Sequence, residues 1–207
     1  MPLIRKPADL ATPPPAPDLE AAKAALRSPD VDMRWRAARA LSAFPEAAGA
    51  LGEASAAEPN ARVREAMFTS LALIGTAECT AVLVLHLRSD DAERRTGAMD
   101  SLRTLPRALG ATLPGLLRDK DPDVRLLACD LVREMPSAEA TVLLTAVLDR
   151  DPEINVCAAA VDVLAEVGAP AALPALHRCA ERFADPFLSF AIKIACDRLG
   201  EQALFRG

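Results

Sequence analysis

The sequence predicts an all-α protein in which helical hairpins stack in a row as an α-solenoid. Three observations support this prediction. The first is the composition: 51% of the 207 residues are hydrophobic but only 3% are aromatic, and the abundant Ala and Leu favour helices over strands. The second is a sequence repeat of about 31 residues. The third is an apolar stripe at helical spacing within each repeat.

The repeat is marked by an apolar residue followed by Pro or Gly. These landmarks end at positions 45, 75, 106, 136, 168 and 200, which lie 30 to 32 residues apart and define six units. Each unit is long enough for two helices and a turn, so it is predicted to be a helical hairpin. The landmark pairs are Phe44-Pro45, Ile74-Gly75, Leu105-Pro106, Met135-Pro136, Val167-Gly168 and Leu199-Gly200.

Three further positions recur at fixed distances before each landmark. Eleven residues before it stands an arginine in the first four units, replaced by Cys157 and Ser189 in the last two. Eight and four residues before it stand apolar residues, which share one face of a helix and are predicted to form the core. The arginines are Arg34, Arg64, Arg95 and Arg125.

Start signals place helices within the units. An acidic residue followed by Pro is typical of a helix start, because the carboxylate caps free N–H groups and Pro fits the first turn. First helices are predicted at 76–87 and 137–148, with Thr76 and Ser137 as N-caps. Pro114 and Pro174 are predicted to bend the first helices of their units. Second helices are predicted to start at Glu58-Pro59, Asp121-Pro122, Asp151-Pro152 and Asp185-Pro186.

The units are predicted to form one domain, residues 18–207. A hairpin of two amphipathic helices cannot cover its own apolar stripe, so neighbouring hairpins must share it. Residues 1–17, MPLIRKPADLATPPPAP, are Pro-rich and predict a flexible tail. This tail is either passive or a short linear motif for a partner.

Charge and cysteine content argue against several function classes. The net charge of -5 disfavours general nucleic-acid binding. The five cysteines are scattered without a CxxC pair, so neither a disulfide framework nor a metal site is predicted. The sequence has no apolar run long enough to span a membrane and no secretion signal, which predicts a cytoplasmic protein with no membrane contact. No cofactor-binding motif is present.

The stretch Asp121 to Val132, DPDVRLLACDLV, and less closely Asp32 to Leu41, resembles a known repeat family. It is similar to the D-x-x-V-R-x-x-A-x-x-x-L pattern of short HEAT repeats of the phycobilin-lyase-like type. The resemblance extends from about residue 18 to about residue 200. It implies a right-handed α-solenoid, a HEAT-like superhelix of about six hairpins, whose second helices line the concave side.

Helical geometry then selects a candidate concave face. Positions one, five and eight residues after the recurring arginine point away from the core stripe. An acidic row there, with the single Trp at one end, favours a basic or amphipathic peptide or helix as the partner. The alternative is a solvated face of ion pairs between residues three apart. The candidate partner-binding residues are Trp35, Arg39, Glu65, Thr69, Asp100, Arg103, Leu126, Asp130, Arg133 and Asp162.

The four recurring arginines allow two interpretations. An arginine row could bind carboxylates or phosphates of a ligand. The interpretation we favour is a structural ladder, in which each arginine joins adjacent hairpins through nearby acids. These acids are Asp32, Asp91, Glu93, Asp121 and Asp123.

These patterns predict a non-catalytic adaptor or scaffold that binds a partner protein segment on its concave surface; bacterial signalling is one such context. The alternative is a phycobilin-lyase-like or other cofactor-handling protein, against which the scarcity of aromatic residues and His argues. HEAT-like di-iron hydroxylases use His-Glu pairs, whereas His86 precedes Leu87 and His177 precedes Arg178. The acidic row disfavours a DNA-repair role. The partner's identity and the oligomeric state stay open.

Overall fold

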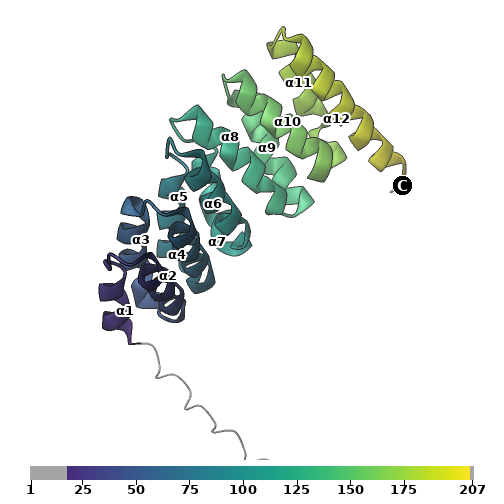
Figure 1. Ribbon diagram of the computed structural model, residues 1–207. Helices are drawn as coiled ribbons and strands as arrows, with labels where there is room; N and C mark the ends of the chain where they lie inside the picture. Colours follow the sequence, from purple (N-terminus) through teal and green to yellow (C-terminus); the bar gives the residue numbers. More distant parts are fainter. Residues whose placement is uncertain (1–17, 206–207) are drawn as a thin grey trace, which may run out of the picture.

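The structure is a computed structural model that describes the backbone of residues 18–205 and the side chains of residues 18–200. This part of the chain holds twelve α-helices, four short 3-10 helices and no strand. The predicted all-α solenoid is therefore confirmed, and its helices pair as six hairpins (Figure 1). The predicted tail, residues 1–17, lies outside the described residues.

Each hairpin consists of an odd-numbered first helix and an even-numbered second helix. The hairpins are α1 (Leu19–Ala25) with α2 (Val31–Ala40), α3 (Ala48–Ala57) with α4 (Ala61–Ile74), α5 (Ala77–His86) with α6 (Ala92–Arg103), α7 (Pro106–Leu116) with α8 (Pro122–Leu131), α9 (Ser137–Arg150) with α10 (Ile154–Val167), and α11 (Leu173–Arg182) with α12 (Pro186–Phe205). The 3-10 helices are Leu41–Ala43, Pro45–Ala47, Val132–Glu134 and Pro170–Ala172.

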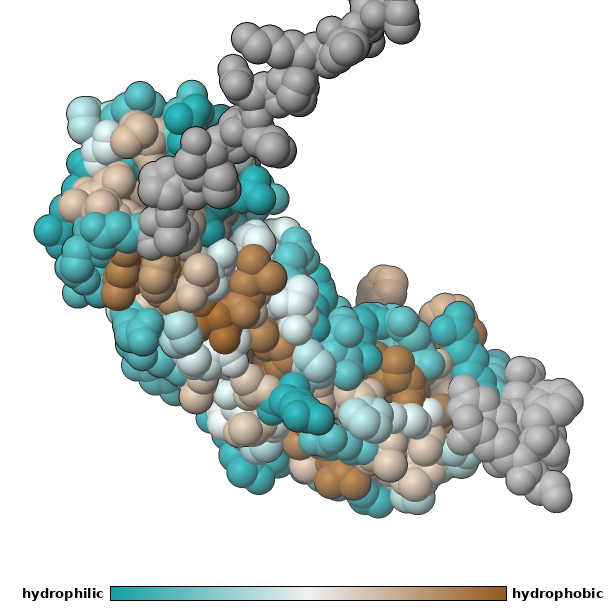
Figure 2. Space-filling view, turned by 90° about the horizontal axis from the view of Figure 1, so that it is seen from below, coloured by the Kyte–Doolittle hydropathy of each residue, from teal (hydrophilic) through white to brown (hydrophobic). Residues whose placement is uncertain are grey.

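First and second helices form two layers along the stack (Figure 1). Successive second helices contact one another from α2 to α12, whereas contacts between successive first helices are sparser. The layer of second helices is therefore the closer-packed one and lies on the inner side of the curve. The space-filling view shows the resulting curved body with its concave side (Figure 2).

The core is a continuous band between the two layers, from Leu26 to Leu199. The stripe positions eight and four residues before each landmark are buried in every unit except at Cys196, which is half-buried. The residue just before the landmark is buried at Met135 and Leu199 and half-buried in the other four units. Leu102, in the middle of the stack, is 0% exposed. Burying a Leu side chain stabilises a fold by about 1.5 to 3 kcal/mol, so this shared band is the main stabilising element.

Two of the four acidic residues predicted to cap second helices do so. The carboxylates of Asp121 and Asp185 accept hydrogen bonds from the amides of Asp123 and Leu188, at 2.9 and 2.8 Å. Thr76 likewise caps α5, because its hydroxyl accepts from the Cys79 amide at 3.2 Å.

Glu58 and Asp151 are not N-caps, which corrects the prediction. Helix α4 is capped by Asn60, and Glu153 occupies the position before α10, so both helices begin later than the acid-Pro signal indicated. The physical reason is that both carboxylates are bound by arginines of the preceding hairpin. Pro59 and Pro152 lie in the short segments that lead into α4 and α10.

Three smaller predictions also need correction. Ser137 is the first residue of α9 and Pro136 precedes it, so Ser137 is not the cap. Pro174 stands in the first turn of α11, where it costs no helical hydrogen bond; only Pro114 lies inside its helix. Helix α12 continues through Gly200 to Phe205, so the sixth landmark does not end a helix.

Candidate partner-binding face

The recurring arginines hold the turns inside their own hairpins. Each donates a hydrogen bond from Nη1 to the carbonyl oxygen six residues earlier, between the first and second helix. This repeated contact satisfies a carbonyl that the helices leave free. The pairs are Arg34 with Ser28 at 2.9 Å, Arg64 with Glu58 at 3.2 Å, Arg95 with Ser89 at 2.6 Å and Arg125 with Asp119 at 2.9 Å.

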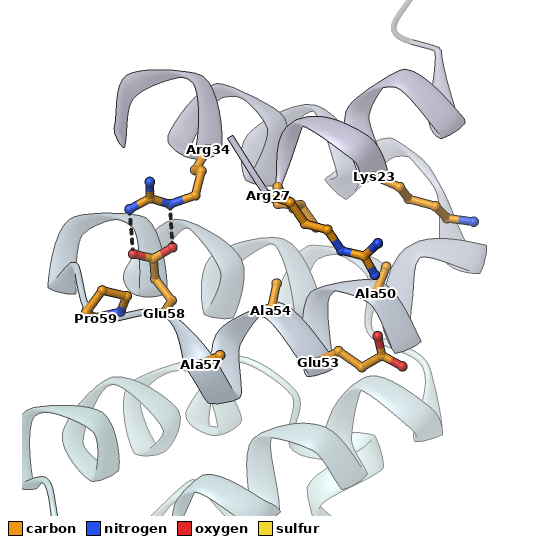
Figure 3. A pocket seen from close by; sticks show the side chains of 10 residues that line it. Lys23, Arg27, Arg34, Ala50, Glu53, Ala54, Ala57, Glu58 and Pro59 are labelled. Atoms are coloured by element: carbon orange, nitrogen blue, oxygen red, sulfur yellow. Dashed lines mark hydrogen bonds and ion pairs between the residues drawn. The ribbon is translucent and has the colours of Figure 1, made fainter. Parts of the chain in front are cut away.

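Two of these arginines also bind a carboxylate of the next hairpin through two hydrogen bonds each. Arg34 donates to both carboxylate oxygens of Glu58, at 2.8 and 3.0 Å (Figure 3), and Arg125 does the same to Asp151 at 2.7 and 3.0 Å. Burial alone would raise the pKa of Glu58, but the hydrogen bonds from Arg34 and the Asn60 amide hold it below its ordinary value. The arginine guanidinium groups are thus engaged in structural contacts.

The other two arginines differ. Arg64 Nη2 lies 3.5 Å from the Asp91 carboxylate and 3.8 Å from that of Glu93. Arg95 has no carboxylate within 4.0 Å among the described side chains. Of the acids expected as ladder partners, Asp91 and Glu93 pair with one of the four arginines, Arg64, and the other three pair with none of them among the described residues.

In the fifth hairpin, which lacks the recurring arginine, an arginine of the next hairpin makes the contact with the turn. Cys157 occupies the arginine position and lies 3.6 Å from the Asp151 carbonyl oxygen. Arg182, on α11 of the next hairpin, donates to the same carbonyl at 2.6 Å and lies 3.3 Å from the Cys157 sulfur. The turn keeps a guanidinium contact although its own helix does not provide one.

A hollow of about 400 Å³ lies between α1 and α3, and Figure 3 shows the side chains that line it. Arg34 and Glu58 close one end of it as an ion pair, and Lys23 pairs with Glu20 at 3.0 Å. Its floor is alanine and Leu26. Most of its charged groups therefore already have partners within the chain.

Two adjoining hollows lie on the side of the second helices. One of about 560 Å³ lies between α4 and α6, and one of about 350 Å³ lies between α2 and α4. Both are lined by Glu65 and Thr69 of α4. The predicted face residues Trp35 and Arg39 line the smaller hollow, and Asp100 lines the larger one.

Trp35 is occupied by arginines of its own chain. It is half-buried against the core, and the guanidinium carbons of Arg39 and Arg62 lie 4.9 and 4.6 Å from the ring centroid. Arg62 also forms an ion pair with Asp32 at 3.0 Å. These cation–π contacts leave Trp35 as a wall of the hollow and less available as an aromatic anchor than the sequence predicted.

A chain of ion pairs across α6, α8 and α10 joins Asp100 to four further predicted face residues, which are Arg103, Asp130, Arg133 and Asp162. Arg103 contacts Asp100 at 2.6 Å and Asp130 at 2.5 Å, and Arg133 contacts Asp130 at 2.9 Å and Asp162 at 2.5 Å. Arg133 also pairs with Glu166. Burial would raise the pKa of Asp130, but hydrogen bonds from Arg133 and Arg103 lower it. This part of the face matches the alternative of a self-paired surface.

Leu126, the remaining predicted face residue, is half-buried and packs against the core. It lines neither hollow. The face predicted from helical geometry therefore divides into an open part over α2, α4 and α6 and a self-paired part over α8 and α10.

Phe68 and Gly97 shape the larger hollow, and the sequence analysis missed both. A Cβ atom at Gly97 would lie 3.1 Å from the Phe68 ring, so glycine lets α6 approach α4 above that ring. Neither residue occupies one of the offsets used to select the face. The available signal was a glycine in the middle of a helix, which costs about 1 kcal/mol relative to Ala and so needs a packing reason.

The family comparison agrees with this architecture. Residues 110–201 match the family profile of HEAT repeats. The hairpins of this stretch are HEAT repeats. No curated protein sequence matches it significantly.

Solved structures resemble the chain at low sequence identity. A chain from a structure on microtubule plus-end tracking by XMAP215, CLIP-170 and EB1 has a TM-score of 0.57 at 13% identity, covering 87% of this chain and 90% of that one. At that identity, the likeness shows a shared fold alone.

Two further structures have lower TM-scores. The HEAT-like repeats protein of the archaeon Thermococcus onnurineus has a TM-score of 0.49 at 16% identity, covering 88% and 87% of the two chains. The CpcE–CpcF complex of phycocyanin lyase from Nostoc has 0.40 at 19% identity, covering 96% and 100%.

His86 and Cys129 are both buried. The His86 ring is 7% exposed, lies 3.0 Å from the Ser55 hydroxyl, and stacks at a tilt on Phe68 with centroids 4.7 Å apart. Burial, with the charges of Arg94 and Arg64, lowers the pKa of His86 to about 4. Burial also raises the pKa of Cys129 to about 12, so this thiol is a poor nucleophile.

Two further features are absent from the described part of the chain. Among those residues, no three His, Cys, Asp or Glu side chains come together as a metal site requires. No helix there has the length and apolar character needed to cross a membrane.

Proposed function

We propose that this HEAT-repeat protein is a non-catalytic scaffold that binds a segment of a partner protein on its concave face. The observation that carries the proposal is the pair of adjoining hollows over α2, α4 and α6. Together they form a depression that crosses three successive second helices. A peptide segment or a helix of a partner fits a surface of this extent better than a small metabolite does.

The side chains around these hollows support the proposal. Glu65, Thr69 and Thr96 are exposed on the rim, whereas the Phe68 ring is 2% exposed beneath it. The underlying helices are packed on the shared core, so the surface is already in place before binding. A preformed surface loses little conformational entropy when a partner docks.

The self-paired face over α8 and α10 has a different part in this proposal. Its acids pair with Arg103 and Arg133, so these carboxylates are less available to a partner than unpaired ones. We assign it to holding α6, α8 and α10 in register and assign binding to the hollows. Charge reversal at Asp130 would therefore disturb the stack as well as the surface.

Photo-crosslinking from single positions tests the proposal. A benzoylphenylalanine residue is placed at Thr96, on the rim of the larger hollow, in cells that produce the protein naturally. The matched control is Val142, which is 68% exposed on first helix α9 and lines neither hollow. We expect a protein adduct from position 96 that is absent from position 142.

The outcomes separate the alternatives. The same adducts from both positions, or none from position 96, would contradict binding in the hollows. A cofactor-handling protein predicts instead a small ligand retained on the purified chain, which native mass spectrometry detects as an added mass.

A further inference from the structure

The structure assigns the hollow between α4 and α6 to a lysine or arginine side chain of the partner segment. This inference rests on the proposed function and names the anchor that would enter the larger hollow.

The side chains that line the hollow carry more negative charge than positive charge. Its acids are Glu65, Glu93 and Asp100, and its only cation is Arg64. Arg64 is 5% exposed and donates to the Glu58 carbonyl, so it is turned into the structure. Glu65 has no basic side chain within 4.0 Å among the described residues.

The other two acids are available as well. The Glu93 side chain is 79% exposed and lies 3.8 Å from Arg64, a distance longer than a direct hydrogen bond. The Asp100 side chain is 62% exposed and shares only one of its oxygens with Arg103. A cation above this rim would contact carboxylates from both α4 and α6.

The walls fit an alkyl chain beneath a charged head. They consist of Ala61, Ala92, the Gly97 backbone and the side chains of Thr69 and Thr96, with Phe68 below. Lysine and arginine bury an aliphatic stem while their charged ends stay at the rim. An apolar side chain would cover the carboxylates without pairing them, and an acidic one would be repelled.

The neighbouring hollow has the opposite character. Arg39 and Arg62 line it beside Trp35, and a partner cation there would face two guanidinium groups. The basic residue of the segment is therefore directed to the α4–α6 hollow. Gly97 keeps the α4–α6 hollow open, since a side chain there would occupy the space above Phe68.

Selection from a random peptide-display library on the purified full-length protein tests the inference. The selected peptides are synthesised and their Kd values measured by fluorescence anisotropy. We expect them to share a Lys or Arg whose replacement by norleucine weakens binding at least about tenfold, the size expected for a charge pair at a binding rim.

Variants of the protein identify the site. Glu65→Gln with Glu93→Gln should weaken binding at least about tenfold and reduce its dependence on salt. The control is Glu139→Gln with Glu181→Gln, two exposed acids far along the stack that change the net charge equally. The control should change Kd less than about twofold.

A third variant separates this inference from the proposed function. Thr96→Trp fills the α4–α6 hollow from an exposed position. Peptides that lose binding to this variant but need no basic residue would overturn the cation anchor and leave the binding face intact. Peptides indifferent to Thr96→Trp, or no selected peptides at all, would overturn both.

Discussion

Arg125 on α8 grips the Asp151 carboxylate at the end of α9 with two hydrogen bonds, of 2.7 and 3.0 Å. The two side chains are 11% and 2% exposed. This pair ties the fourth hairpin to the fifth, as Arg34 and Glu58 tie the first to the second. It also explains why the Asp151-Pro152 signal does not cap a helix.

We expect Asp151→Asn to lower the free energy of unfolding by about 3 kcal/mol. Removing one partner of a buried pair leaves the other charge without compensation, which typically costs 3 to 5 kcal/mol. Urea denaturation followed by circular dichroism measures the change. The matched control is Asp100→Asn, whose side chain is 62% exposed and whose loss should cost less than about 1 kcal/mol. Equal losses would show that the buried pair has no special role.

The free energy of unfolding should decrease as the pH is lowered from 6.5 to 5, because of His86. The pKa of His86 is about 4 in the folded state and about 6.5 in the unfolded state. As the pH falls, the unfolded state therefore binds the proton first and becomes more stable relative to the folded state. Linkage gives a loss on the order of 1.5 kcal/mol over this interval. Chemical denaturation at several pH values measures it.

The control for this effect is His86→Gln, which keeps a polar group near Ser55 but does not titrate. We expect its stability to be nearly flat from pH 6.5 to 5. Carboxylates with lowered pKa values, such as Glu58 and Asp130, lose their stabilising effect only at lower pH, so they do not obscure this interval. An unchanged pH slope in the variant would rule out His86 as the cause.

Leu102→Ala should cost about 2 to 5 kcal/mol, because it opens a cavity in the shared core. Leu102 is 0% exposed in the middle of the stack. Leu85→Ala is the comparison, since Leu85 is 67% exposed on α5 and its truncation should change stability by less than about 0.5 kcal/mol. A Leu102 variant as stable as the wild type would contradict the core assignment.

Gly75→Ala should destabilise the fold by about 1 kcal/mol. Gly75 ends α4 with φ of 68°, a left-handed conformation that costs a side-chain-bearing residue about 1 to 2 kcal/mol. Gly115→Ala is the matched substitution, because Gly115 has no atom within 4 Å of its Cβ position and lies within α7. There the better helix propensity of Ala should stabilise the protein slightly. Thermal unfolding of the two variants should therefore shift in opposite directions.

The sequence by itself determined the hairpins and the core. The spacing of about 31 residues and the apolar stripe are local properties of the chain, and they locate Leu102 and its equivalents inside the stack. Helix starts were predictable where one residue alone does the capping, as at Asp121 and Thr76. Local signals are reliable there because no distant residue competes for the same group.

Only the tertiary structure decided which partners the charged residues take. Glu58 and Asp151 looked like caps in the sequence, but arginines 24 and 26 positions away in the chain bind them. Gly97 and Phe68 meet because α4 and α6 are neighbours in the stack, and their contact creates the hollow. A side chain with several possible partners chooses among them by distance in space, and the packing of the hairpins sets those distances.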